Sequence, residues 1–191
     1  IRLEAAPVAP VFSSVGAGDG AAAFSPCGRY RWWLRRAWDP ARPPLLFIGL
    51  NPSRAGAERD DPTLRRLQGF ARRWGYGSLE VLNLFARISA SPALLRRSHD
   101  PVGADNDHWL RQRLQQGPAA LWLGWGNGGH WRDRDQQVLA LIADSAPAGL
   151  PLLALALTAS GQPRHPLYAP AAAQPLQLQH PGGVFRPAAF P

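Results

Sequence analysis

The sequence contains no lysine, no methionine and a single cysteine, and it has no long apolar run. One cysteine, Cys27, excludes an internal disulfide and any zinc or iron–sulfur site built from cysteines, so we interpret it as a buried or idle thiol. The absence of lysine excludes the Gly-x-x-x-x-Gly-Lys loop that cradles phosphates. No apolar run reaches the length of a membrane span, so we expect a cytoplasmic protein with no membrane partner.

The charge is strongly positive, and arginine alone provides the cations. The 21 basic residues against 13 acidic ones give a formal net charge of +8. Arginine favours bidentate contact with phosphate and stacking on bases, so the composition permits a nucleic-acid partner. A coding bias towards G and C produces the same composition, and the charge therefore does not establish that partner.

The length of 191 residues suits one domain with a sizeable core and two tails. We expect a flexible N-terminal arm over residues 1–23, because it is rich in Ala, Pro, Gly and Ser and has little periodicity. A single α/β domain follows over residues 24–168. Residues 169–191, rich in Ala, Pro and Gln, are expected to form a poorly ordered tail.

A buried strand is predicted over residues 45–53, which read Leu-Leu-Phe-Ile-Gly-Leu-Asn-Pro-Ser: an apolar run that ends in a polar turn. Further buried strands are predicted at 79–86, 119–125 and 150–157, and an aromatic, partly alternating strand at 30–38. Helices are predicted at 62–74, 105–116 and 132–143, the first with Asp61 as its cap and Pro62 as its first residue. This alternation predicts an α/β fold, a three-layer αβα sandwich around a four-stranded parallel sheet.

Polar residues follow the predicted parallel strands at or near their carboxyl ends, where open α/β sheets place their ligands. They are Asn51, Asn83, the turn at 126–129, and His165. Asn51 either closes a turn or binds a ligand, and His165 is either structural or functional. Two amides and an imidazole in one crevice could read a planar heterocycle by its hydrogen-bonding edge.

Several catalytic patterns are missing from the sequence. It has no Gly-x-Ser-x-Gly elbow and no His-Glu-x-x-His motif. Asp61 serves as a helix cap, which leaves Asp60 as a possible base or cation ligand. We assign no metal site and expect no cofactor.

Seven segments, in unbroken order over about residues 24–168, resemble one uncharacterised bacterial family, domain-of-unknown-function family 1643. The segments are Phe24-Ser-Pro-Cys-Gly-Arg-Tyr, Gly49-Leu-Asn-Pro-Ser, Asp60-Asp-Pro-Thr, Trp74-Gly-Tyr-Gly, Asn83-Leu-Phe-Ala, Asp100-Pro-Val-Gly and Arg164-His-Pro-Leu-Tyr. The resemblance names no activity.

A more distant resemblance links the chain to the uracil-DNA glycosylase superfamily. Gly49-Leu-Asn-Pro is similar to that superfamily's first-strand turn, Val81-Leu-Asn-Leu to its base-reading strand, Leu121-Trp-Leu-Gly-Trp-Gly to its penultimate strand, and Arg164-His-Pro to its last turn. The resemblance implies the same fold around a four-stranded parallel sheet. It also implies that Asn51 positions the attacking water, that His165 stabilises the departing base and that Asn83 reads the base.

The first hypothesis is therefore hydrolysis of the N-glycosidic bond of a modified base in DNA, with Phe85 or Tyr76 stacking on the base. Contacts with the nucleic acid are expected from Ser53, Arg54, Arg65, Arg164, Leu167 and Tyr168. No carboxylate stands at Asn51, which leaves open a second hypothesis, a non-catalytic module that binds nucleic acid or a nucleotide. A third is a hydrolase that uses Asp60 with a divalent cation.

Overall fold

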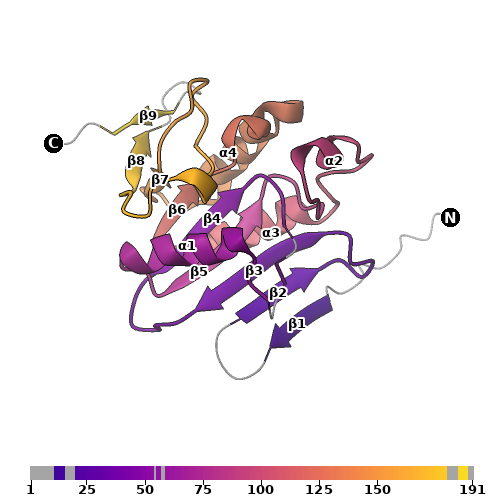
Figure 1. The fold of residues 1–191 in the computed structure, drawn as a ribbon, viewed down its shortest axis with the longest axis horizontal. Coiled ribbons are helices and arrows are strands. Elements are labelled where there is room, and N and C mark those ends of the chain that lie inside the picture. The colour runs from indigo at the N-terminus through magenta and orange to yellow at the C-terminus, as the bar shows by residue number, and fades with distance from the viewer. Residues whose placement is uncertain (1–10, 16–19, 54, 57–58, 180–184, 189–191) are drawn as a thin grey trace.

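The computed structural model describes residues 11–15, 20–53, 55–56, 59–179 and 185–188, and its fold is shown in Figure 1. The strands of the described part are Val11–Val15 (β1), Gly20–Phe24 (β2), Arg31–Ala37 (β3), Pro44–Gly49 (β4), Ser78–Asn83 (β5), Ala120–Leu123 (β6), Leu152–Ala154 (β7), Leu176–Gln179 (β8) and Arg186–Pro187 (β9). The α-helices are Pro62–Arg73 (α1), Pro92–Arg96 (α2), Asn106–Gln115 (α3) and Arg134–Ser145 (α4), with 3₁₀ turns at Gly126–Asp133 (η1) and Pro166–Tyr168 (η2).

The predicted four-stranded parallel sheet is wrong. The described strands form one nine-stranded mixed sheet in the order β1-β2-β3-β5-β4-β6-β7-β8-β9. Strands β5, β4, β6 and β7 are parallel to one another, while all the other neighbours pair antiparallel. Long apolar runs identify strands buried on both faces, so the sequence pattern located the parallel centre of the sheet and missed its edges.

The two segments expected to be a flexible arm and a poorly ordered tail supply the outer strands. Strand β1 lies within the expected arm, residues 1–23, and β2 extends one residue beyond it, to Phe24. Strands β8 and β9 lie within the expected tail, residues 169–191. Alanine fills most of β2, and β8 is only four residues long, so both carry little of the apolar signal by which buried strands are recognised. The sheet therefore extends well beyond its parallel centre on both sides.

Helices cover both faces of the sheet (Figure 1). In β4, Leu45 and Phe47 pack on the face covered by α1, whereas Leu46 and Ile48 pack on the face covered by α3 and α4. This two-residue alternation follows from the pleat of the strand. No helix in the described part of the chain is long and apolar enough to cross a membrane.

The predicted start of α1 is confirmed. The backbone N–H of Leu64 donates to the Asp61 carboxylate at 2.8 Å, and Pro62 is the first helical residue. The helix then buries Leu64, Leu67, Phe70 and Ala71 against the sheet. A capped and amphipathic helix of this kind holds its N-terminal turn rigidly beside the carboxyl ends of the parallel strands.

Candidate functional site

A cavity lies at the carboxyl edge of the parallel strands, between the sheet and the first turns of α1. We call it the carboxyl-edge cavity; it is lined by Arg31, Phe47, Gly49, Leu50, Asn51, Ser53, Ala55, Thr63, Leu64, Leu67, Val81, Asn83 and His165. About 30 Å³ of it admits the centre of a water molecule, and the hollow with its opening to solvent is about 360 Å³. The structure thus brings together three predicted residues, Asn51, Asn83 and His165, from three separate segments.

Asn83 ends β5 and is 4% exposed, and its Nδ2 has no hydrogen-bond partner among the described residues. Its backbone is held from behind, because Asn106 Nδ2 donates to the carbonyl oxygens of Asn83 and Leu84 at 3.1 and 2.9 Å. Arg134 Nε also donates to the Leu84 carbonyl, at 2.8 Å. A buried amide costs free energy unless it finds a partner, so the Asn83 side chain, carried on a fixed backbone, is a candidate to bind a ligand.

Gly49 makes room for the Asn83 amide. The two residues are register partners at the ends of β4 and β5. A β-carbon at Gly49 would lie 2.9 Å from Phe47 Cε1 and 3.0 Å from Asn83 Oδ1, closer than ordinary van der Waals contact. Glycine is therefore required here for its small size, and it keeps this wall of the cavity open.

The Asn51 amide has a fixed orientation. Its Nδ2 donates to the backbone carbonyls of Pro52 at 3.1 Å and Ser89 at 3.0 Å. Both amide hydrogens are thereby used, which leaves Oδ1 as the atom that can accept a hydrogen bond from water or a ligand. An acceptor held in this way orients a water molecule without being able to take its proton.

His165 lines the opposite side as a neutral hydrogen-bond donor. The backbone N–H of Leu167 donates to its Nδ1 at 3.2 Å, which places the ring proton on Nε2. Burial lowers the pKa of His165 from its ordinary value. Arg66 on α1 holds the turn in place by donating to the backbone carbonyls of Pro166, at 3.1 Å, and Ala169.

Arg31 is a cavity residue that the sequence reasoning did not identify. A bulge in β3 places it there, because Ala23 pairs with Trp33 while the next residue of β2, Phe24, pairs with Arg31. Trp32 and Trp33 consequently both stack on Trp109, on the face covered by α3, and Arg31 falls on the α1 face. Bulges re-aim side chains in this manner.

The charge of Arg31 is poorly compensated. The side chain is 3% exposed, its Nη1 donates to the Ala55 carbonyl at 2.6 Å, and its Nε has no hydrogen-bond partner among the described residues. No described carboxylate forms an ion pair with it. Burial lowers the pKa of the guanidinium to about 10, although the nearby Asp61 carboxylate acts in the opposite direction. A buried cation of this kind is costly for the free protein.

Asp60 and Asp61 both have structural partners. Asp60 forms an ion pair with Arg36, with Nη2 and Oδ1 2.8 Å apart, and also accepts from Gln68, and it does not line the cavity. Asp61 caps α1 and accepts from the Ser53 hydroxyl. Among the described residues no three His, Cys, Asp or Glu side chains are placed to hold a metal ion.

The two predicted stacking residues lie away from the cavity. Phe85 is fully buried on the other face, 5.0 Å between ring centroids from Trp131. Tyr76 precedes β5 at the amino edge of the sheet, where it packs with the core on the α1 face, and burial raises the pKa of its phenol. The length of β5 therefore separates Tyr76 from Asn83, roughly 20 Å at the rise of a strand.

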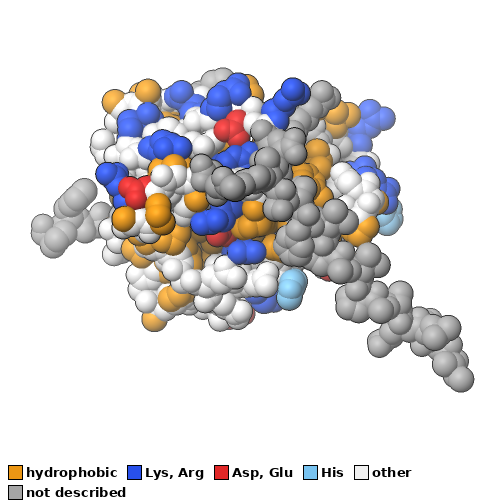
Figure 2. Space-filling model, turned by 90° about the horizontal axis from the view of Figure 1, so that it is seen from below, with side chains coloured by type: hydrophobic (Ala, Val, Ile, Leu, Met, Phe, Trp, Pro, Cys, Tyr) orange, Lys and Arg blue, Asp and Glu red, His pale blue; other side chains and the backbone are white. Residues whose placement is uncertain are grey.

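The predicted nucleic-acid contacts lie in different surroundings. Ser53 lines the cavity, Arg65 and Arg164 are exposed, and Leu167 is half-buried. Arg54 and the side chain of Tyr168 lie outside the described part of the chain. On the face shown in Figure 2, arginine side chains are spread among apolar and neutral ones, and carboxylates are fewer.

Cys27 is exposed and has hydrogen-bonding neighbours, which corrects its interpretation as a buried or idle thiol. Hydrogen bonds from Arg29 and Ser25 lower the pKa of the thiol to about 6. It does not line the carboxyl-edge cavity.

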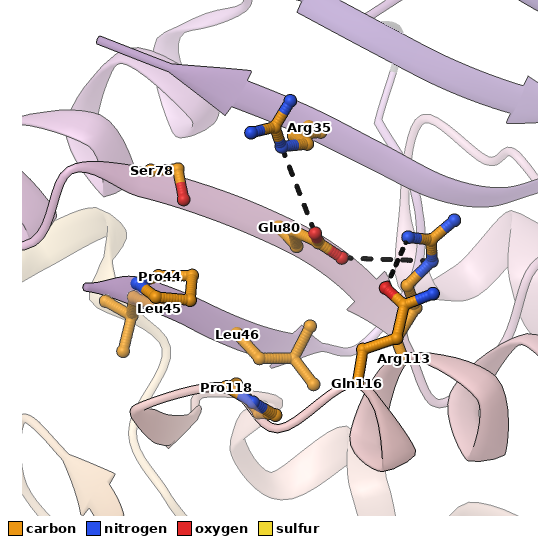
Figure 3. Close-up of a pocket in the computed structure, with 9 residues that line it drawn as sticks. All are labelled: Arg35, Pro44, Leu45, Leu46, Ser78, Glu80, Arg113, Gln116 and Pro118. Atoms are coloured by element: carbon orange, nitrogen blue, oxygen red, sulfur yellow. Dashed lines mark hydrogen bonds and ion pairs between the residues drawn. The ribbon is translucent and has the colours of Figure 1, made fainter. Parts of the chain in front are cut away.

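A larger cavity of about 220 Å³ lies at the amino edge of the parallel strands, beside the first residues of β4 and β5 (Figure 3). We call it the amino-edge cavity; it is lined by Arg35, Pro44, Leu45, Leu46, Ser78, Glu80, Arg113, Gln116 and Pro118. Its charged groups pair with one another: Glu80 lies 4.0 Å from Arg35 Nε and 3.8 Å from Arg113 Nε. Arg113 Nε has no hydrogen-bond partner among the described residues, as Arg31 Nε has none, so the two cavities differ in that Arg113 lies beside a carboxylate and Arg31 forms no ion pair with a described one.

Fold and site together define an α/β protein with a mixed sheet and a polar cavity at the carboxyl edge of its parallel strands. The model of a family described as "Protein of unknown function (DUF1643)" matches residues 31–167, and the chain belongs to that family. No curated protein and no solved structure matches the chain significantly. The first resemblance is thus confirmed, and the likeness to the uracil-DNA glycosylase superfamily stays a prediction.

Proposed function

We propose that the protein hydrolyses the N-glycosidic bond of a nucleobase in the carboxyl-edge cavity, and that its substrate is a modified base in DNA. The observation that carries the proposal is the convergence of Asn51, Asn83 and His165 on one cavity, each with a functional atom left for a ligand. The short motifs similar to the uracil-DNA glycosylase superfamily support the same assignment of roles.

In the proposed reaction the bond between the sugar carbon and the base nitrogen breaks, and both electrons leave with the base. The oxygen of a water molecule, oriented by Asn51 Oδ1, bonds to the sugar carbon, and the proton that it releases finally neutralises the base. His165 Nε2 donates a hydrogen bond to the base oxygen that gains negative charge, and the Asn83 amide pairs with the edge of the base. Such preorganised donors stabilise charge as it develops.

Exposed arginines, among them Arg65 and Arg164, provide contacts with phosphate in this proposal, and Leu167 is placed beside His165. A base inside a duplex has to leave the stack before its edge can enter the cavity. Leu167 is accordingly a candidate for the side chain that fills the vacated position.

A second function, binding of nucleic acid or a nucleotide without catalysis, is favoured by one observation. The residues that line the carboxyl-edge cavity include no carboxylate, and the imidazole of His165 carries its proton on Nε2 and accepts the Leu167 N–H at Nδ1, so neither ring nitrogen is free to take the proton of a water molecule. In this alternative the same side chains hold the base, and no bond is broken.

The test measures base release from oligonucleotides that carry uracil, hypoxanthine or alkylated bases, single- and double-stranded. The wild type and Asn51→Ala are compared with Asn127→Ala, which replaces an exposed asparagine that does not line the cavity. Release by the wild type and by Asn127→Ala, and its loss in Asn51→Ala, is the expected result. Binding of the oligonucleotides without release by any of the three proteins would favour the second function.

A further inference from the structure

Arg31 lines the carboxyl-edge cavity but has no part in the reaction described above. It reaches the cavity through the bulge in β3, and a single backbone carbonyl, that of Ala55, accepts from it among the described residues. The Asp61 carboxylate lies near enough to favour the charged guanidinium but forms no ion pair with it, and a buried charge without a paired counter-ion costs several kcal/mol. A chain that carries this cost at the wall of a cavity, where an apolar residue would pack, has a use for the charge in its ligand-bound state.

Two side-chain hydrogen-bond donors line the cavity together with Arg31. Asn83 Nδ2 has no partner among the described residues, and His165 presents its Nε2–H. Thr63 and Leu64, in the first turn of α1, line the same space, but this end of the helix is already capped by the Asp61 carboxylate. One cation and two donors are satisfied together by an oxygen that carries negative charge.

The size of the cavity limits what can enter. A space of about 30 Å³ for water centres holds about two waters, since one water needs roughly 10–15 Å³ by this measure. It therefore accepts one or two atoms of a ligand, such as the edge oxygen of a heterocycle, while the ring itself remains in the wider mouth.

We propose that Arg31 binds an anionic oxygen of the ligand. In the proposed reaction, on which this inference rests, that oxygen is the base oxygen that becomes negative as the glycosidic bond breaks. The charge is absent from the bound substrate and present in the transition state, so the attraction of Arg31 accelerates the reaction instead of merely tightening binding. A phosphate oxygen of a nucleotide has the same chemistry and is the other source of such a group.

The experiment compares the affinities of two free bases of similar shape, uracil, which is neutral at pH 7, and 5-nitrouracil, which is an anion at pH 7. Orthophosphate is the probe for the second source. The proteins are the wild type, Arg31→Met, Arg31→Lys and two controls. Arg113→Met removes an arginine from the amino-edge cavity, and Asp144→Asn removes an exposed carboxylate that does not line the carboxyl-edge cavity.

The wild type is expected to bind 5-nitrouracil at least about ten-fold more tightly than uracil, as a charge-assisted hydrogen bond predicts. Arg31→Met loses this preference, Arg31→Lys keeps part of it, and both controls keep all of it. Lowering the pH until 5-nitrouracil is neutral abolishes the preference in the wild type.

Orthophosphate binding that depends on Arg31, without a preference for 5-nitrouracil, would support the binding of an anionic oxygen by Arg31. It would also show that this oxygen belongs to a phosphate and not to a base. A preference that survives in folded Arg31→Met, together with phosphate binding independent of Arg31, would overturn the inference. The proposed function fails separately: if no base is released but the Arg31-dependent preference is present, the inference holds for a binding module and the hydrolase is rejected.

Discussion

The two cavities at opposite ends of the parallel strands both contain buried or partly buried arginine, but only one of them contains a carboxylate that balances the charge. At the amino edge, Arg113 and Arg35 lie on either side of Glu80, which also accepts from the Trp33 indole at 2.7 Å (Figure 3). At the carboxyl edge, Arg31 has no ion-pair partner among the described residues, and Asn83 Nδ2 no hydrogen-bond partner among them. Arg113 Nε also has no hydrogen-bond partner among the described residues, so the difference lies in the carboxylate: Glu80 balances the amino-edge arginines, whereas the charge of Arg31 is left for a ligand.

The largest expected effect separates the two cavities by activity. Asn83→Ala removes the amide that pairs with the base edge, and we expect the rate of base release to fall by about 100-fold, as for the loss of one preorganised hydrogen-bonding group. Glu80→Gln, in the amino-edge cavity, is expected to change the rate by less than about two-fold, because its side chain does not line the carboxyl-edge cavity. Single-turnover measurements on one substrate check both, and equal losses in the two variants would contradict the comparison.

For the free energy of unfolding we expect the reverse order, with the larger loss from the substitution in the amino-edge cavity. Glu80→Ala leaves the Trp33 indole without its acceptor and the partly buried Arg113 without its ion-pair partner, so we expect the free energy of unfolding to fall by about 1–3 kcal/mol. Arg31→Met removes a buried cation that has no ion pair among the described residues, and we expect a gain of about 1 kcal/mol.

Urea unfolding of the two variants and the wild type, with equal m-values, checks this contrast. Destabilisation of Arg31→Met by as much as Glu80→Ala would show that the Arg31 charge serves the free protein instead of a ligand.

The pH dependence of stability reports on His165 in the carboxyl-edge cavity. Burial lowers the pKa of His165 below its ordinary value of 6.5, so the unfolded chain binds a proton more readily than the folded one. Stability is therefore fully present above pH 6.5 and falls as the pH decreases through that value. His165→Asn should remove this part of the profile, whereas replacement of the exposed His108 by Asn should leave it in place. A pH profile of stability that is unchanged by His165→Asn would refute the assignment of this pH dependence to His165.

The smallest expected effect lies outside both cavities. Hydrogen bonds from Arg29 and Ser25 lower the pKa of the exposed Cys27 thiol to about 6, so the thiolate predominates at pH 7. The rate of alkylation by iodoacetamide should reach half its maximum near pH 6, and Arg29→Gln should move that midpoint upwards. Labelling should leave base release unchanged. A midpoint near pH 9 in the wild type would contradict the proposed hydrogen bonding of Cys27.

The parts of the fold that the sequence predicted are those with local signals. The cap at Asp61, the proline after it and the apolar spacing located α1, and apolar runs located β4, β5 and β6. The outer strands are short and lack the continuous apolar runs of the central strands, so their local signal is weak.

The sequence predicted the site residues that the order of the strands brings together, and it missed the one that a local irregularity of a strand places there. Asn51, Asn83 and His165 follow strands that end at one edge, which a parallel arrangement brings together. Arg31 reaches the cavity through a bulge, for which the adjacent pair Trp32 and Trp33, a break in strict alternation, was the available signal.

The most direct test follows the side-chain nitrogens of both cavities by NMR as 5-nitrouracil is added. Signals of Arg31 Nε, Arg113 Nε and Asn83 Nδ2 are assigned from the corresponding single substitutions. We predict that Arg31 Nε and Asn83 Nδ2 shift together with one binding constant, while Arg113 Nε does not move. Shifts at Arg113 Nε with none at Arg31 and Asn83 would place the ligand in the amino-edge cavity and contradict the account.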